Sequence, residues 1–338
     1  MKSRLIPLAA ALACAAAIPA HAEGPINGKV YGKLRLSIDH INQDQSGGKN
    51  QSLNKLESHA SRIGFAGKTE LEGQDGLAVI YQAEYGVDGQ IGSGAGNWTT
   101  RNTFLGLDGS FGQIIAGVHD TPMKSSQDGV DQFNDLDGDL GAIFNGEDRL
   151  SQMVMYSTPS MGAVHGSVAL VMSKDNAADI NKATNTDKNG VSASLSYDSG
   201  MLYGAVAYNS NIRNANTTRV TGVIKPMSDL QVGALWQQTK YDDTSLASGV
   251  VSGTNAGDSQ SGYLLSAGYS VGGGTTLKAE YGNSDIYKLG LAGYNKDASI
   301  GADHKIGKNT KIEGWYTQLK QDNGDKTGYL AIGMEHKF

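Results

Sequence analysis

The chain has 338 residues, among them 46 Gly, 15 Tyr and a single Cys, and its formal net charge is -6. That much Gly and Tyr argues against a helix-rich enzyme, because Gly costs about 1 kcal/mol at a helical position and aromatic residues favour strands. One Cys excludes a disulfide scaffold and Cys-based zinc or iron–sulfur sites. Hydrophobic residues make up 39% of the chain, which is compatible with a soluble protein or with a membrane barrel that has a polar lumen.

Residues 1–22 have the pattern of a secretory signal peptide. Lys2 and Arg4 precede an apolar run, and Ala20-His21-Ala22 supplies the small residues that signal peptidase requires. After this segment, no run of about 18 apolar residues predicts a transmembrane helix. We therefore expect an exported protein in which residues 23–338 form one domain, since neither a linker nor a change of composition interrupts them.

The first strand is predicted over residues 28–40, where apolar and polar residues alternate. Leu34 and Ile38 share one face, and Lys33 and Arg35 share the other. The same period of two recurs to the end of the chain, with charges on each polar face. It predicts sixteen strands, over residues 28–40, 59–71, 75–86, 99–109, 111–120, 149–159, 163–173, 188–198, 200–210, 217–225, 228–240, 261–272, 274–284, 293–306, 309–320 and 327–338.

The connections between these strands alternate in length. Short turns such as Gly73-Gln74-Asp75-Gly76 and Gly272-Gly273-Gly274 alternate with long polar loops. Successive connections of an up-and-down barrel emerge on opposite rims, so this pattern predicts one rim of tight turns and one rim of long loops. The fold expected is therefore all-β, a sixteen-stranded antiparallel transmembrane β-barrel. Its long loops are expected at residues 41–58, 87–98, 121–148, 174–187 and 241–260.

The last predicted strand ends on Phe338, which is also the last residue of the sequence. A soluble domain rarely stops at an exposed aromatic residue without a tail. At this point the sequence resembles the general porins of Gram-negative outer membranes, whose chains end in a strand with a terminal Phe that the barrel-assembly machinery reads. Further matching motifs follow in order along the mature chain: Val30-Tyr31-Gly32-Lys33, Ser61-Arg62-Ile63-Gly64-Phe65-Ala66-Gly67, Arg101-Asn102-Thr103-Phe104-Leu105-Gly106-Leu107 and Phe111-Gly112-Gln113.

The resemblance implies a homotrimer in the outer membrane of a Gram-negative bacterium, surrounded by lipid and lipopolysaccharide. Periplasmic chaperones and the barrel-assembly machinery would insert it, with Phe338 as the assembly signal. Ions and small hydrophilic solutes would diffuse through it passively. In this family the third long loop, here 121–148, folds into the lumen and carries acids that face basic residues on the wall. The residues expected at this constriction are Lys33, Arg62, Arg101, Arg149, Asp128, Asp131, Asp135 and Asp137.

Loop 121–148 is strongly acidic. Its acids outnumber the four wall bases and Lys124 by two, so we expect a weak preference for cations. Salt limits the range of electrostatic interactions to about 8 Å at physiological ionic strength, so these local charges should set the preference. Asp135, Asp137 and Asp139 also resemble the opening of a calcium loop, since alternate carboxylates can converge on a hard cation. The calcium-loop template fails at Leu140 and Gly146. A pore-lining acidic rim is the main interpretation, with specific calcium binding as an alternative.

The sequence contains no GxSxG, P-loop or HExxH pattern. We therefore expect no enzyme activity, no cofactor and no nucleic-acid partner. A barrel that acts mainly as a ligand-binding or adhesion protein through its long loops is the alternative to a diffusion channel, and conductance in a planar bilayer distinguishes the two. Trp236 and Trp315 are expected in the aromatic girdles at the membrane surfaces, with a sugar-binding platform as the alternative.

Overall fold

The protein is built almost entirely of antiparallel strands. The computed structural model describes residues 27–48, 50–74, 76–88, 98–172, 189–213, 215–241, 259–286 and 293–338. The expected signal peptide, the whole of the expected loop 174–187, most of the loops 87–98 and 241–260 and residue 49 of the loop 41–58 lie outside these residues. The strands are β1 (Asn27–Asp44), β2 (Gln51–Ser58), β3 (Arg62–Glu70), β4 (Ala78–Gly86), β5 (Thr99–Thr100), β6 (Thr103–Gly109), β7 (Gly112–Asp120), β8 (Arg149–Ser157), β9 (Val164–Val171), β10 (Gly190–Asp198), β11 (Leu202–Ile212), β12 (Ala215–Met227), β13 (Leu230–Tyr241), β14 (Ser259–Gly272), β15 (Thr275–Ser284), β16 (Lys296–Lys305), β17 (Thr310–Lys320) and β18 (Lys326–Lys337).

These segments form a closed barrel of sixteen strands, as the periodicity predicts. The strands β2 and β3 are two parts of one barrel strand, because both pair with β1. In the same way β5 and β6 both pair with β4. Each remaining segment pairs with its neighbours in the sequence, and β1 also pairs with β18. Closure leaves no unpaired sheet edge, which a strand surrounded by lipid could not tolerate.

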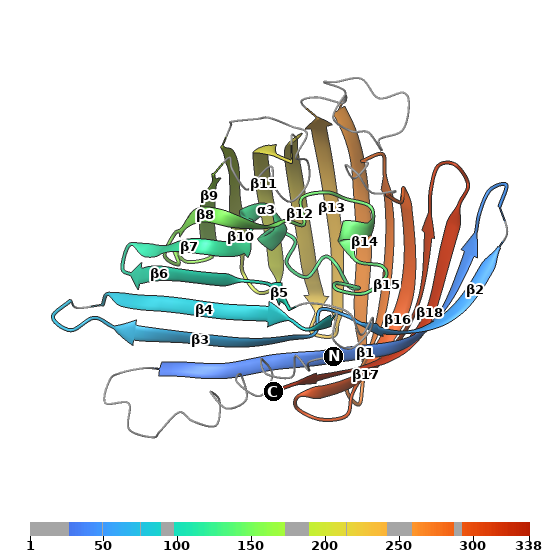
Figure 1. Ribbon diagram of the computed structural model, residues 1–338, viewed down its shortest axis with the longest axis horizontal. Coiled ribbons are helices and arrows are strands. Elements are labelled where there is room, and N and C mark those ends of the chain that lie inside the picture. The colour runs from blue at the N-terminus through green and yellow to red at the C-terminus, as the bar shows by residue number, and fades with distance from the viewer. Residues whose placement is uncertain are drawn as a thin grey trace, which may run out of the picture.

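The two ends of the barrel meet at the terminal residue. The backbone N–H of Gly32 donates to the Phe338 carbonyl at 2.9 Å, and the N–H of Phe338 donates to the Gly32 carbonyl at 3.0 Å. A Cβ atom on Gly32 would lie 2.5 Å from the Phe338 ring. The terminal ring therefore covers a position that only glycine can occupy without displacing it. Figure 1 shows the C-terminal strands beside β1.

The predicted extent of the first long loop, residues 41–58, is wrong. Residues 51–58 form strand β2 instead of part of a loop, and β1 continues to Asp44 to pair with it. The residues of β2 are mostly exposed on both faces, so periodicity could not reveal a strand that depends on backbone pairing. The interruption before β3 contains Ala60, whose φ of 51° lies in the left-handed region. This irregularity turns the chain between the two parts of the barrel strand.

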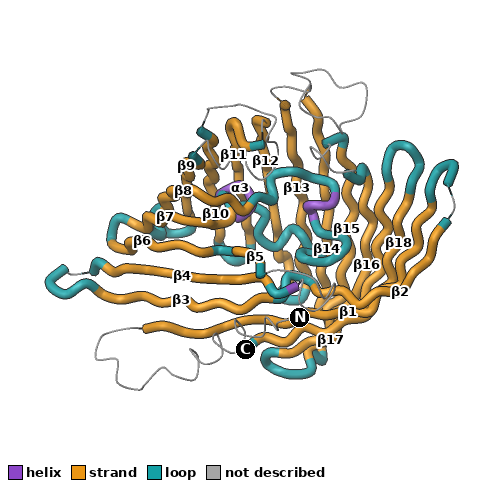
Figure 2. Tube along the Cα trace, in the orientation of Figure 1, coloured by secondary structure: helices purple, strands orange, loops and turns teal. Residues whose placement is uncertain are grey.

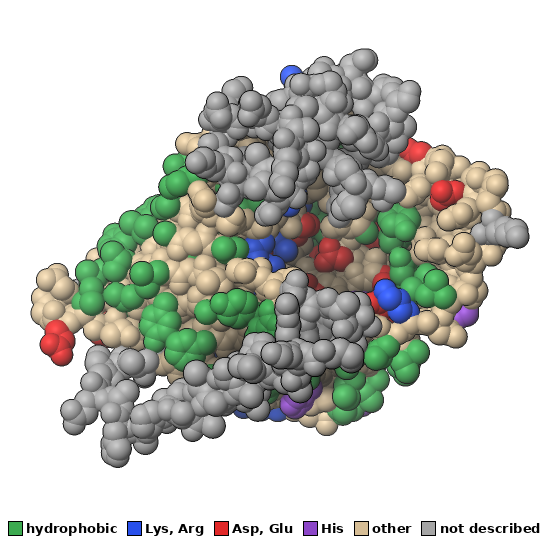
Figure 3. Space-filling view, in the orientation of Figure 1, with side chains coloured by type: hydrophobic (Ala, Val, Ile, Leu, Met, Phe, Trp, Pro, Cys, Tyr) green, Lys and Arg blue, Asp and Glu red, His purple; other side chains and the backbone are tan. Residues whose placement is uncertain are grey.

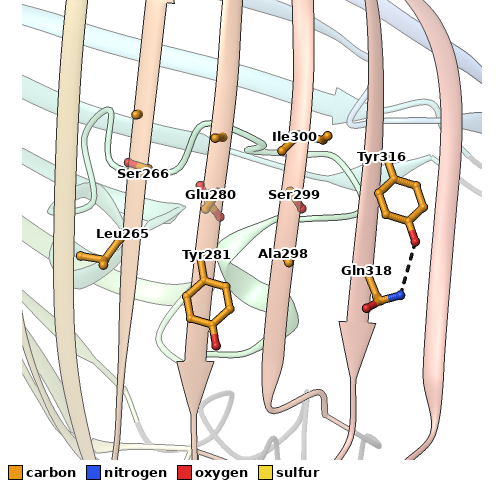
Figure 4. Close-up of a pocket in the computed structure, with 11 residues that line it drawn as sticks. Leu265, Ser266, Glu280, Tyr281, Ala298, Ser299, Ile300, Tyr316 and Gln318 are labelled. Atoms are coloured by element: carbon orange, nitrogen blue, oxygen red, sulfur yellow. Dashed lines mark hydrogen bonds between the residues drawn. The ribbon is translucent and has the colours of Figure 1, made fainter.

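Apolar side chains cover the outside of the barrel, and polar side chains line the inside. On β1, Lys33 and Arg35 are buried while Leu34 and Ile38 are exposed, which confirms the predicted alternation. Figure 4 shows a shallow groove on the outer face between β14 and β17, with Tyr281 and Tyr316 among its lining residues. An outer surface of exposed leucine, isoleucine and tyrosine is unfavourable in water and suits a lipid environment.

Segment 121–148 lies inside the ring of strands (Figures 1 and 2). It contains α3 (Pro122–Ser125), which Thr121 caps by accepting a hydrogen bond from the N–H of Lys124, and the 3₁₀-helix η1 (Leu140–Ala142). Its side chains Leu140, Ile143 and Phe144 pack against Val223, Leu235 and Leu264 of the wall. Neither of these described helices is long and apolar enough to span a membrane.

Candidate functional site

The strand β1 and the beginning of β3 bring two basic residues to the same loop acid. The Nζ atom of Lys33 lies 3.0 Å from Oδ2 of Asp135, and Nη1 of Arg62 lies 3.8 Å from the same oxygen. Asp135 has a φ of 63°, a left-handed conformation that Asp tolerates better than most residues. The tip of segment 121–148 therefore rests against the basic part of the wall.

The other two wall bases lie on neighbouring strands. Arg101 occupies the break between β5 and β6, and its Nε donates to Oε1 of Glu84 at 2.7 Å. Because of this break, Arg101 lies outside the alternating residues of β6. Arg149 donates from Nε to Asn102 at 2.8 Å and lies 3.0 Å from Asp120. All four bases are thus engaged with acids or amides.

Several charged wall residues belong to the same network but were not among the expected site residues. The guanidinium of Arg35 donates to both carboxylate oxygens of Glu313, at 2.5 and 2.8 Å, and to the carbonyl of Asn134 at 2.9 Å. Glu335 lies 3.5 Å from Lys33. The period of two already put Arg35 on the polar face of its strand, so a signal for it existed. No sequence signal indicated that Arg35 would pair with Glu313 on β17, nearly 280 residues away.

The loop acids have different environments. Asp128 is exposed, whereas Asp131 is buried and accepts hydrogen bonds from the backbone N–H groups of Phe133 and Leu140. Asp131 therefore supports the fold of the loop more directly than it contacts the lumen. Burial raises the pKa of Asp131 well above its ordinary value, and the Asp139 carboxylate adds to this effect.

Asp135 and Asp137 lie at the tip of the loop. Burial acts to raise the pKa of Asp135, but the Lys33 ammonium together with the Arg62 and Arg101 charges outweighs it and holds that pKa below its ordinary value. Burial raises the pKa of Asp137 to about 6, although a hydrogen bond from the Trp315 indole opposes the increase. That bond is 2.8 Å long.

Trp315 is not in a membrane girdle, contrary to expectation. It has only 3% of its surface exposed and points inward, whereas Trp236 is 43% exposed on the outside. Side chains two residues apart on a strand point to the same face, so Trp315 points inward like Glu313 on β17.

The three carboxylates of the alternative calcium site bind separate partners. Asp135 contacts Lys33, Asp137 accepts from Trp315, and Asp139 accepts from the backbone N–H groups of Asp135 and Gly141. Within the part of the chain that the structure describes, they do not form a group that could hold one ion.

The far part of the loop is attached to the opposite wall. Arg219 of β12 has no exposed surface, and it donates to Glu147, to the Met123 and Asn145 carbonyls and to Gln237. Basic and acidic side chains gather around the hollow in the middle of the molecule (Figure 3). A charged passage of this kind, enclosed by a barrel with an apolar exterior, is the architecture of a membrane channel.

Comparison with known sequences defines the family. A family model for the Gram-negative porin matches residues 9–324, and the chain belongs to this family. It is 27% identical over 374 residues to the major outer membrane protein P.IB of Neisseria sicca, with 100% of both chains covered. It is 23% identical to outer membrane porin protein 32 of Delftia acidovorans, with 99% of this chain and 94% of the relative covered.

Solved structures share the fold at lower identity. The anion-selective porin from Comamonas acidovorans has a TM-score of 0.66 and 18% identity, covering 93% of this chain and 100% of that one. OmpF of Salmonella typhi, in complex with daunomycin, has a TM-score of 0.67 and 17% identity, with 93% and 98% covered. The protein is an outer-membrane porin channel, and its relatives are channels, not enzymes.

Proposed function

We propose that the protein forms a homotrimeric, water-filled pore through which ions and small hydrophilic solutes diffuse passively, with ion preference set at a constriction between wall and loop. The trimer is supported by a related structure of OmpT from Vibrio cholerae, which is described in trimer form. The observation that carries the constriction is the 3.0 Å contact between Lys33 and Asp135. It joins the basic wall to segment 121–148 in the interior.

Pairing of the loop acids changes the expected charge balance. Arg219 pairs with Glu147 and Arg213 pairs with Asp148, and neither arginine was counted among the wall bases. The two surplus negative charges expected from the sequence are thereby offset. We therefore propose a pore with weak selectivity, whose sign depends on the few charges that a passing ion approaches most closely: Lys33, Arg62, Arg101 and Arg149 with Asp135, Asp137 and the exposed Asp128.

Single-channel reversal potentials in a salt gradient test this proposal. Replacing Arg62 and Arg101 by Ser should shift the reversal potential toward cations, and replacing Asp135 by Asn should shift it toward anions. A unit charge about 4 Å from an ion contributes about 1 kcal/mol even in bulk water, so each shift should correspond to a several-fold change in the permeability ratio.

Lys68→Ser provides the matched control. Lys68 lies on the same strand as Arg62 but six residues further along, a separation of about 20 Å and beyond the screening length of about 8 Å. Its loss should leave the reversal potential unchanged. Equal shifts in the control and the test variants would exclude a local constriction, and the absence of steady conductance would favour the ligand-binding alternative.

A further inference from the structure

Three side chains from distant parts of the chain converge where the loop tip meets the wall. Asp39 lies on β1, His59 lies in the interruption between β2 and β3, and Asp137 lies on segment 121–148. One carboxylate oxygen of each Asp and one ring nitrogen of the His all lie within 4.8 Å of one another. No other group of three such residues that could hold a metal ion occurs in the described part of the chain.

Asp39 supplies an independent observation. Its exposed surface is 0%, and neither of its carboxylate oxygens has a hydrogen-bond partner among the residues that the structure describes. A buried carboxylate without partners is strongly unfavourable unless a cation compensates it. The nearest ring nitrogen, Nε2 of His59, is 4.0 Å from Oδ2 of Asp39. That distance leaves room for an ion between the two groups, because metal–ligand bonds to oxygen and nitrogen are about 2.0–2.2 Å long.

Neighbouring groups orient the other two side chains. The Trp315 indole donates to Oδ2 of Asp137 at 2.8 Å, which leaves Oδ1 of that carboxylate available. The Ser37 hydroxyl lies 2.8 Å from Nε2 of His59 and gives up this contact when a metal ion binds to that nitrogen. The His59 and Trp315 rings pack in a T-shaped arrangement with centroids 5.6 Å apart, which fixes the plane of the imidazole. Outer contacts of this kind hold ligand side chains in place in metal sites.

We propose that Asp39, His59 and Asp137 form a binding site for a divalent transition-metal ion of the Zn²⁺ class, which links the loop tip to the barrel wall. The mixture of one imidazole and two carboxylates favours such an ion over Ca²⁺ or Mg²⁺, which prefer oxygen ligands alone. Water completes the coordination, since the protein offers three ligands. Ligand atoms of a tetrahedral zinc site are about 3.3 Å apart, so metal binding should shorten the present 4.0 Å separation between Asp39 and His59.

Titration of Zn²⁺ into the full mature protein, stripped with a chelator and held in detergent, tests the site directly by calorimetry. We expect saturable binding of one ion per chain, and His59→Gln should lose it. Co²⁺ should give the visible absorption of a site with a nitrogen ligand, and this absorption should be absent in His59→Gln. Trp315→Phe keeps all three ligands but removes the orienting hydrogen bond, and should weaken binding about tenfold or more.

His165→Gln is the matched control, because His165 also lies on the wall but its ring nitrogen contacts Ser167 and, within the described ranges, no carboxylate. It should bind Zn²⁺ as the wild-type protein does. Equal affinity in wild-type protein and His59→Gln would overturn the site. Asp39→Asn should also lose Zn²⁺ binding. If that variant fails to fold, the His59 and Trp315 variants still decide whether the metal site exists.

The functional consequence rests on the proposed channel function. Zn²⁺ should reduce current fluctuations in wild-type protein and His165→Gln but not in His59→Gln, because it restrains the loop tip, and Mg²⁺ at equal concentration should have no effect. Reduced fluctuations in His59→Gln as well would contradict a tie at this site. Metal binding without any conductance would refute the channel proposal alone, and conductance without metal binding would refute the metal site alone.

Discussion

Arg219 holds one end of the internal segment with a single guanidinium group. It has no exposed surface and donates to four partners, of which Glu147 is the charged one. Removing one partner of a buried pair leaves the other charge uncompensated, which costs about 3–5 kcal/mol. The same residue also influences titration: burial raises the pKa of Glu147, and the Arg219 charge opposes this increase.

Arg219→Met should therefore release segment 121–148. We expect the fraction of barrels with an open segment, measured by limited proteolysis of the folded protein, to increase at least about a hundredfold. Glu147→Gln in the same chain should restore much of the attachment. Arg213→Met is the control, because its pair with Asp148 is partly exposed and its loss should have a smaller effect.

The same variant should respond to pH with a defined sign. A carboxyl group whose folded pKa is raised contributes stability below its unfolded pKa and loses it as the pH increases through the folded pKa. Arg219→Met raises the pKa of Glu147 further, since Asp139 disfavours the charge and only Lys124 still favours it. Opening should thus be greater at about pH 8 than at about pH 5. Opening that is independent of pH would show that Glu147 is not the group left uncompensated.

At the scale of the element, β18 closes the barrel through its last residue. The two backbone hydrogen bonds between Phe338 and Gly32 extend the β1–β18 ladder, and the aromatic ring covers Gly32. The terminal residue thus takes part in closure as well as matching the expected assembly signal. Deletion of a residue from an exposed loop removes neither contribution.

Deleting Phe338 should strongly reduce the amount of folded protein in the outer membrane. The closing ladder loses two hydrogen bonds, and the chain loses its terminal aromatic residue. Gly32→Val with Phe338 intact separates closure from the signal, because its Cβ would meet both the Phe338 ring and the Arg62 carbonyl while the terminal residue is kept. If the signal dominates, this variant should reach the membrane and unfold at a lower temperature. Wild-type levels after deletion of Phe338 would contradict both roles.

At the scale of the whole molecule, the inside and outside are reversed relative to a soluble protein. Charged residues such as Lys33 and Glu313 are buried in the interior, while Ile38, Ile300 and Ile332 are each more than 60% exposed on the exterior. Such an exterior is stable in lipid or detergent, and the closed hydrogen-bond ladder resists opening by detergent.

The protein should therefore migrate as a compact oligomer on electrophoresis without boiling and as an extended monomer after boiling. Cooperative loss of the ladder on heating causes the change, since no strand can leave without exposing two edges. A protein that stays monodisperse in plain buffer, with no change of mobility on boiling, would be incompatible with the barrel in a membrane.

Alternation along the chain was sufficient to predict the sixteen barrel strands and their inward and outward faces, because each strand has lipid on one side and a polar lumen on the other. It placed Lys33 and Arg35 inside before any pairing was known. Alternation did not predict a strand over residues 51–58, because both faces of β2 are mostly exposed and only its hydrogen-bonded pairing with β1 defines it. Local sequence therefore predicts a strand where burial differs between its faces.

The contacts of the site were decided by the tertiary structure. Arg35 meets Glu313 only because closure of the barrel brings β1 beside the C-terminal strands, and Lys33 meets Asp135 only because the internal segment packs on the wall. The convergence of Asp39, His59 and Asp137 has the same origin. Periodicity reports which side of a strand a residue faces, since that depends on its immediate neighbours. It carries no information about which distant residue lies opposite, because that depends on barrel closure and on the path of the loop.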